Sequence, residues 1–215
     1  MKFRIVTDSS SNVLSLPHED YGCVPMKIVA GREYVDAPGL NIAQMVEDLK
    51  GYKGKTGSSC PNVGEWLEAF GDAKYVFGIT ITKHLSGSYN AARQAAQTYM
   101  EEHPDRRVYL FDSLSAGPES MMIADKIRQC EAAGDDFDTT IAKVLDYHNH
   151  THTVFCAESI NNLARNGRVS LAVAKLAGIL GIRIIGEAQG GQIVAIHKPR
   201  GEKKALLTMV QVVKE

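Results

Sequence analysis

The hydrophobic and polar positions change period repeatedly along the first 157 residues. Short apolar runs rich in β-branched and aromatic residues predict strands at residues 3–7, 24–29, 75–81, 108–111 and 153–157. Longer runs with helical spacing predict helices at residues 42–49, 63–70, 86 or 88 to 100, 118–133 and 139–147. Strands that alternate with helices form βαβ units. The pattern therefore predicts an α/β fold with a mostly parallel sheet flanked by helices.

Polar residues at the ends of these runs predict where the helices begin and end. Asn41 is a suitable N-cap for the helix at 42–49, and Asn62 with Glu65 forms the pattern of a capping box. Asp138 is the candidate cap for the helix at 139–147, and Gly134 a terminator for the one before it. Gly31 opens a turn toward a short strand at 33–35, which predicts a small hairpin.

The pattern changes near residue 158. Helical spacing at 159–165 and 170–180 is interrupted by Asn166-Gly167-Arg168, and apolar runs at 182–188 and 192–197 flank Gly190-Gly191 as in a hairpin. A final helix is predicted at 203–214. We expect two domains, an α/β domain over residues 1–157 and a smaller α+β domain over residues 158–215.

Composition excludes several classes of function. The 215 residues carry a net charge of −1, so no general basic field attracts nucleic acid. No segment approaches the roughly 20 apolar residues of a membrane span, and the N-terminus lacks the pattern of a signal peptide. Four widely spaced cysteines without a CxxC motif are typical of reduced thiols. We expect a cytoplasmic protein without stable membrane insertion.

Hydroxyl side chains crowd the segments that follow three predicted strands. These segments are Thr7-Asp8-Ser9-Ser10-Ser11, Thr82 to Ser88 and Ser113-Leu114-Ser115, and a fourth cluster is Thr56-Gly57-Ser58-Ser59. Ligands of open α/β sheets bind at the carboxyl ends of the strands. Each cluster alone is explained by helix capping. Several together also suit a small anion, such as a carboxylate or phosphate, held by hydroxyls and helix N-termini.

Common catalytic motifs are incomplete in this sequence. Gly54-Lys55-Thr56 matches the tail of a phosphate-binding loop, but Leu49 stands where the first glycine belongs and no strand precedes it. Ser86 does not lie in a G-x-S-x-G elbow, although His84 is near it in sequence. A serine-dependent hydrolase or a phosphotransferase that uses the hydroxyl loops remains an alternative, as does an interaction protein without a ligand.

Four further features allow two interpretations each. His148, His150 and His152 alternate, so they would share one face of a strand and gather a metal, or else lie at a helix end or in a loop. Asp8 and Asp112 follow strands, and one of them could be a metal ligand or a catalytic acid, but loop ordering through backbone N–H groups is the favoured role for both. Arg168 is either a solvated turn residue or a partner of the anion.

The ordered set of motifs resembles the DegV family of bacterial fatty-acid-binding proteins. The matching segments are Val6-Thr7-Asp8-Ser9-Ser10, Val24-Pro25-Met26, Lys55-Thr56 through Pro61, Leu85-Ser86-Gly87-Ser88-Tyr89, Phe111-Asp112-Ser113 and Asn166-Gly167-Arg168-Val169-Ser170. The resemblance implies two domains that bury a long-chain fatty acid. It also implies no catalysis and no cofactor in this chain, which would present the acyl carboxylate to a separate fatty acid kinase for phospholipid synthesis.

The resemblance also implies which residues bind the ligand. The carboxylate would be held by Ser58 or Ser59, with Thr56 possible, and by Ser86 supported by Gly87 and Ser88; Arg168 is the family's second-domain arginine. Lys83-His84 replaces smaller residues and would add bulk or charge near the head group. The segment from Thr56 to Pro61 is longer than the usual loop, and family members usually have a larger second domain. We therefore expect a shortened second domain that covers the acyl chain in part.

Overall fold

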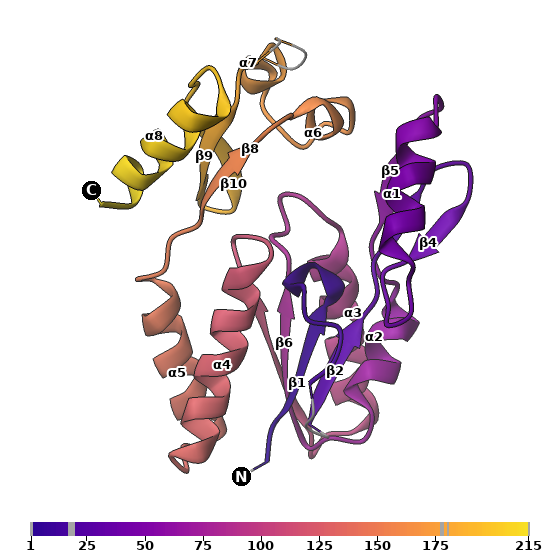
Figure 1. The fold of residues 1–215 in the computed structure, drawn as a ribbon. Coiled ribbons are helices and arrows are strands. Elements are labelled where there is room, and N and C mark those ends of the chain that lie inside the picture. Colours follow the sequence, from indigo (N-terminus) through magenta and orange to yellow (C-terminus); the bar gives the residue numbers. More distant parts are fainter. Residues whose placement is uncertain (1, 17–19, 177–178, 180, 215) are drawn as a thin grey trace. The chain divides into compact units, whose positions relative to one another are not determined.

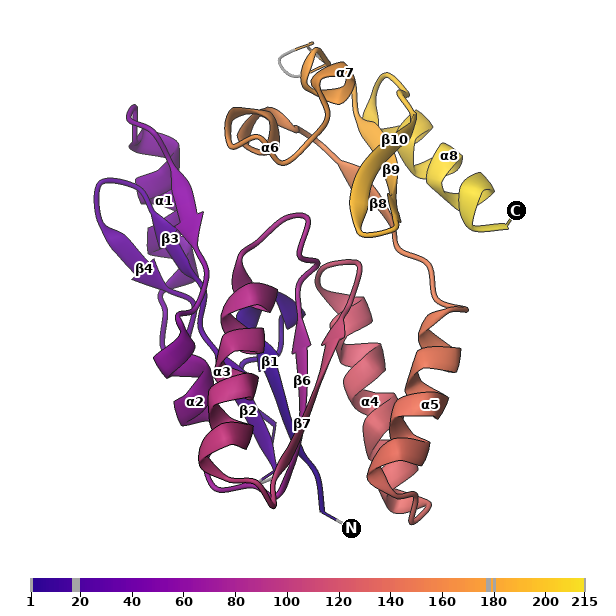
Figure 2. The ribbon, with the colours of Figure 1, turned by 180° about the vertical axis from the view of Figure 1, so that it is seen from behind.

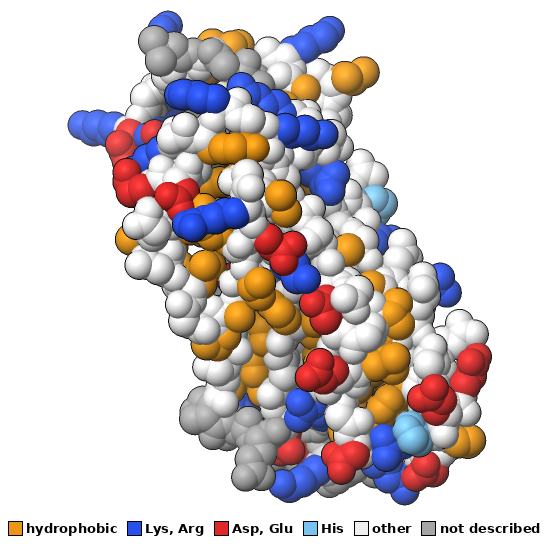
Figure 3. Space-filling model, turned by 90° about the vertical axis from the view of Figure 1, so that its right-hand side faces the viewer, with side chains coloured by type: hydrophobic (Ala, Val, Ile, Leu, Met, Phe, Trp, Pro, Cys, Tyr) orange, Lys and Arg blue, Asp and Glu red, His pale blue; other side chains and the backbone are white. Residues whose placement is uncertain are grey.

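The computed structural model describes residues 2–16, 20–176, 179 and 181–214. The chain divides into two compact units, Met1–Thr151 and His152–Glu215. In the described part of the chain, no helix is both long and apolar enough to cross a membrane. On the face drawn in Figure 3, hydrophobic side chains lie among acidic and basic ones, in agreement with a net charge near zero.

A four-stranded parallel sheet forms the centre of the first unit. Its strand order is β2-β1-β6-β7, and every neighbouring pair runs parallel. Figures 1 and 2 show α2 and α3 on one face of this sheet and α4 and α5 on the other. The bounds are β1 Arg4–Asp8, β2 Tyr21–Val24, β6 Tyr75–Thr80, β7 Arg107–Asp112, α2 Val63–Phe70, α3 Ser88–Glu102, α4 Pro118–Ala132 and α5 Phe137–His148. The predicted α/β fold is confirmed.

Alternating side chains of the central strands supply two cores, one on each face of the sheet. Ile5 and Phe77 pack toward α4 and α5, whereas Val6 and Val76 pack against Trp66 of α2 and the alanine-rich face of α3. All of these side chains are buried. Burial on both faces explains why the strands appear as continuous apolar runs in the sequence.

A second, antiparallel sheet was only partly predicted. Its order is β4-β3-β5, with α1 (Ile42–Gly51) packed near it, and its strands are β3 Lys27–Val29, β4 Glu33–Val35 and β5 Gly57–Ser59. The single strand predicted at 24–29 is wrong, because Val24 ends β2 of the parallel sheet and Lys27 begins β3. The strand β5 was missed, since Gly-Ser-Ser has low intrinsic strand propensity. Pairing with β3 forms it.

Local capping chemistry was largely predictable. Asn41 accepts a hydrogen bond from the Gln44 N–H, and Asn62 and Glu65 form the reciprocal capping box. The predicted cap of α5 is wrong, because the side chain of Asp136 accepts the Thr139 N–H instead. Asp138 is inside α5, where it forms an exposed ion pair with Arg107.

The second unit contains a three-stranded antiparallel sheet with the order β10-β9-β8. Its elements are β8 Val154–Ala157, α6 Asn161–Arg165, α7 Leu171–Ala174, β9 Ile184–Gln189, β10 Gln192–His197 and α8 Glu202–Lys214. The strand predicted at 153–157 therefore pairs with β9 and not with the parallel sheet. The helix predicted at 170–180 ends at Ala174, and residues 177, 178 and 180 of that prediction lie outside the described residues.

Candidate functional site

Three hydroxyl-bearing segments follow β1, β6 and β7, at the carboxyl edge of the parallel sheet (Figure 2). The first forms η1 (Ser9–Ser11), the second leads into α3, and the third leads into α4. Parallel strands bring these segments together, since their carboxyl ends share one edge. The hydrogen bonds of these segments show which hydroxyls donate to other protein groups and which have no acceptor among the described residues.

Asp8 connects two of these segments. Its side chain is only 1% exposed. Oδ2 accepts the Ile81 N–H at 3.0 Å and the Ser88 hydroxyl at 2.6 Å, and Oδ1 accepts the Ser10 hydroxyl. Burial raises the pKa of this carboxyl, although the hydrogen bonds from Ser10 and Ser88 oppose the shift. The predicted loop-ordering role of Asp8 is confirmed.

Asp112 orders the segment after β7 in the same way. Its Oδ1 accepts the Leu114 N–H at 3.1 Å, which accompanies the left-handed backbone of Leu114 (φ 51°). The Lys83 Nζ lies 3.4 Å from Asp112 Oδ2 and 5.8 Å from the ring centroid of Tyr89. The charge that Lys83 brings to this loop is therefore paired with Asp112.

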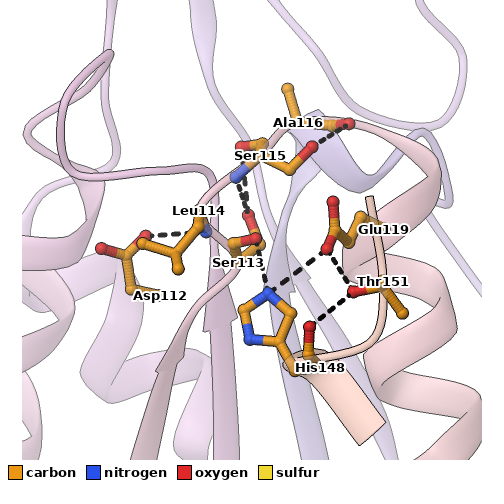
Figure 4. A network of polar contacts seen from close by, with 8 residues as sticks. All are labelled: Asp112, Ser113, Leu114, Ser115, Ala116, Glu119, His148 and Thr151. Atoms are coloured by element: carbon orange, nitrogen blue, oxygen red, sulfur yellow. Dashed lines mark hydrogen bonds and ion pairs between the residues drawn. The ribbon is translucent and has the colours of Figure 1, made fainter. Parts of the chain in front are cut away.

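The hydroxyls of the third segment are committed to a buried network (Figure 4). The Ser113 hydroxyl donates to the Ser115 carbonyl at 3.0 Å and accepts the Ser115 N–H at 3.2 Å. The His148 Nε2 lies 2.9 Å from the Ser113 carbonyl and 3.3 Å from Glu119 Oε1, which also accepts the Thr151 hydroxyl at 2.5 Å. The hydrogen bond with Glu119 raises the pKa of His148, against the effect of burial.

The second segment has a different arrangement. Helix α3 begins at Ser88 with Gly87 as its N-cap, so neither Ser86 nor Ser88 is the capping residue that the sequence suggested. Ser88 is buried, and its hydroxyl donates to Asp8. Ser86 is half-buried, and its Oγ accepts the Ser88 N–H at 3.3 Å. No hydrogen bond among the described residues uses the hydroxyl hydrogen of Ser86.

The fourth hydroxyl cluster lies beside the second segment. Ser58 and Ser59 are exposed on β5, where neighbouring side chains point to opposite faces, and Thr56 is half-buried just before it. The Cys60 Sγ would lie 3.1 Å from a Cβ placed on Gly87. This close approach brings the end of β5 to the start of α3. No local sequence pattern predicts the contact between Cys60 and Gly87.

Arg168 belongs to the second unit, where the end of α6 determines its position. The Arg168 N–H bonds the Leu163 carbonyl and Gly167 adopts φ +67°, which is the Schellman pattern of helix termination. The exposed guanidinium donates to the Asn166 carbonyl at 2.8 Å.

The second unit also contains a cavity of about 510 Å³. Five aliphatic side chains contribute to its wall: Ile160, Leu176, Ile179, Ile182 and Ile184. Glu158 and Arg183 form an ion pair at its polar side, 3.4 Å apart. The cavity is therefore lined by both aliphatic and polar or charged side chains.

The alternating histidines form no metal site within the described residues, where no group of three or more potential ligands is close enough to hold an ion. His148 ends α5 and contacts Glu119, while the Nδ1 of exposed His150 lies 2.7 Å from the Asp146 carbonyl. In the described part of the chain, no histidine ring is hydrogen-bonded to Ser58, Ser59 or Ser86.

Comparison with known proteins identifies the class to which this fold and these loops belong. The model of the DegV family, described as an uncharacterised protein family, matches residues 2–215. The chain therefore belongs to the DegV family, as its motifs suggested. A DegV domain-containing protein of Streptococcus pneumoniae R6 is 34% identical over 212 residues, which cover 96% of this chain and 75% of that protein.

Two solved structures of the family are similar over nearly the whole chain. The Fak B3 protein of the Streptococcus pneumoniae fatty acid kinase, loaded with linoleic acid, has a TM-score of 0.94 and 34% identity, covering 100% of this chain and 79% of its own. A DegV family protein of Eubacterium eligens, loaded with heptadecanoic acid, has a TM-score of 0.92 and 37% identity, covering 99% of this chain and 78% of its own.

Proposed function

We propose that this chain binds a long-chain fatty acid and presents its carboxylate to a separate fatty acid kinase. One observation carries the proposal: the Ser86 hydroxyl hydrogen is unused in the described structure, in a loop that Gly87 brings against the end of β5. Fatty acids bound to the similar structures from S. pneumoniae and E. eligens support the choice of ligand.

Neutral donors suit the carboxylate in this role. Ser86, one of the β5 hydroxyls and the N-terminal N–H groups of α3 can donate to it without a cation, while Lys83 is paired with Asp112. A strong ion pair would lower the nucleophilicity of the oxygen that must attack ATP. Because Ser58 and Ser59 point to opposite faces, only one of them would contribute, with Thr56 on the side of Ser58.

The acyl chain would supply most of the affinity. Each buried methylene contributes about 0.8 kcal/mol, so a chain of roughly sixteen carbons needs little from the head group beyond orientation. We propose that the second unit covers this chain, as the family resemblance implies, and we assign Arg168 to the anion as a weaker, exposed partner. The first unit would then recognise the head group, and the second would cover the chain.

The proposed role is non-catalytic and places the protein in the cytoplasm. Chemistry would belong to the kinase, which transfers a phosphoryl group to the presented carboxylate. A serine hydrolase would instead need a base on Ser86, and the described residues place no histidine ring on it.

Extraction of the purified protein followed by mass spectrometry tests the binding proposal. We expect a co-purified C16–C18 fatty acid in about stoichiometric amount, and uptake of oleate by the delipidated protein. Protein that contains no lipid and takes up neither oleate nor palmitate would contradict the proposal. A second assay adds a purified bacterial fatty acid kinase with ATP, where acyl phosphate should form only when both proteins are present.

A further inference from the structure

Asp8 is an acidic side chain buried at the edge where an anion is proposed to bind. It is 1% exposed, and no Lys, Arg or His of the described residues forms a hydrogen bond or ion pair with it. Its partners are the hydroxyls of Ser10 and Ser88 and the backbone N–H groups of Ile81 and Ser10. Burying a charge is costly unless it is well hydrogen-bonded, so a carboxylate in this place needs a reason beyond packing.

The hydrogen bonds lead from Asp8 to Ser86 in two steps. The Ser88 hydroxyl donates to Asp8 Oδ2 at 2.6 Å, which fixes the first residue of α3. The Ser88 N–H then donates to Ser86 Oγ at 3.3 Å. Ile81, at the start of the same loop, donates its N–H to the same Oδ2. One carboxylate oxygen therefore holds both ends of the loop that contains Ser86.

We propose that Asp8 is the positioning residue of the head-group site, holding Ser88 and through it Ser86, so that the Ser86 hydroxyl is oriented toward a ligand acceptor. This inference rests on the proposed function. Ser88 is then a support and not a ligand contact, because its only hydroxyl hydrogen is used by Asp8. A carboxylate ligand, which accepts but does not donate, takes its bond from Ser86.

The charge of Asp8 gives the proposal a measurable signature. An ionised Asp8 repels an anionic ligand, whereas a protonated one does not, so affinity should fall as pH rises through the pKa of Asp8. Tyr21 and Cys23 of the neighbouring strand β2 are the titratable groups that interact electrostatically with Asp8, and both are hydrogen-bonded to Thr7. Burial raises the pKa of Tyr21 above its usual value and that of Cys23 to about 12, so both stay neutral near pH 7.

Two substitutions at this position separate positioning from charge. Asp8→Asn retains one oxygen that accepts from Ser88 and Ile81, so the loop before α3 keeps its support without the charge. Asp8→Ala removes both the oxygen that supports the loop and the negative charge. We expect Asp8→Ala and Ser88→Ala to weaken oleate binding by tenfold or more. We expect Asp8→Asn to bind at least as tightly as the unmodified protein.

Isothermal titration with oleate in steps from pH 4.5 to pH 9 is the test, with Asp138→Asn as the matched control at the exposed Arg107 pair. The ratio of the Asp8→Asn affinity to the unmodified affinity should rise with pH, to about fivefold or more, while the control ratio stays near one. The ligand's own titration cancels in this ratio. Equal, pH-independent losses in Asp8→Asn and Asp8→Ala would overturn the inference and leave the proposed function intact. Absence of oleate binding in the unmodified protein would overturn both.

Discussion

The loops after β6 and β7 contain similar serine pairs but use them differently. In the loop after β7, Ser113 and Ser115 are buried, and the Ser113 hydroxyl both donates to and accepts from Ser115. In the loop before α3, Ser88 is committed to Asp8, whereas the hydroxyl hydrogen of half-buried Ser86 has no described acceptor. We propose that unused hydrogen-bonding capacity, and not the number of hydroxyls, distinguishes the ligand site.

The largest effect is expected from His148→Ala, which breaks the hydrogen-bond network of the loop after β7. The variant loses the contacts of His148 Nε2 with Glu119 and with the Ser113 carbonyl, in a place where the side chains of His148 and Glu119 are less than 10% exposed. Breaking a buried pair in this way costs about 3–5 kcal/mol. Urea unfolding should show this loss. Lys50→Ala, which removes the exposed pair with Glu47, is the control and should change stability by less than about 1 kcal/mol. A His148→Ala protein as stable as that control would show that the network does not hold the loop.

The next effect concerns Ser86, in the loop between β6 and α3. Ser86→Ala should weaken oleate binding by about tenfold to a hundredfold, because a hydrogen bond to a charged group contributes about 1.5–3 kcal/mol. Stability should fall by about 1 kcal/mol or less, because the variant also removes the oxygen that accepts the Ser88 N–H at 3.3 Å. Titration of Ser58→Ala and Ser59→Ala in parallel should show a loss in only one of them. Unchanged affinity in Ser86→Ala would remove the distinction between the two loops.

A smaller effect is expected from Ser113→Ala, the counterpart of Ser86→Ala in the loop after β7. Removing a hydroxyl that both donates and accepts should lower the free energy of unfolding by about 1 kcal/mol. Oleate affinity should be the same as in the unmodified protein. An affinity loss as large as that of Ser86→Ala would mean that both loops contact the ligand.

The smallest effect is the dependence of stability on pH. The pKa of His148 is raised in the folded protein, chiefly by Glu119, so protonated His148 stabilises the fold. This contribution is complete below the unfolded value of about 6.5 and is lost as pH rises through the folded pKa. Unfolding free energies at pH 6 and pH 8.5 should therefore differ more in the unmodified protein than in His148→Gln. Equal differences would show that His148 does not titrate against Glu119.

The sequence predicts features that depend on near neighbours. The capping box of Asn62 and Glu65, the alternation of core residues in the parallel strands and the order of βαβ units all follow from local patterns. It does not predict β5, whose Gly-Ser-Ser becomes a strand through pairing with β3, or the pairing of β8 with β9 in the sheet of the second unit. Those outcomes depend on partners distant in the chain.

The same limit applies to the site. The sequence indicates that Ser86, Ser88 and Ser113 lie in hydroxyl-rich loops, but it cannot show which hydroxyls have acceptors. That distinction depends on Asp8, 80 residues from Ser88, and on Gly87 meeting Cys60. Family motifs were sufficient to identify the class, because the motifs are local even though the contacts are not.

A crystal structure of the protein with bound oleate would test the central claim most directly. The account predicts a carboxylate oxygen at hydrogen-bond distance from Ser86 Oγ, with the Ser88 hydroxyl still on Asp8 and the loop of Ser113 unchanged. A carboxylate held elsewhere, with Ser86 turned toward another protein group, would contradict it.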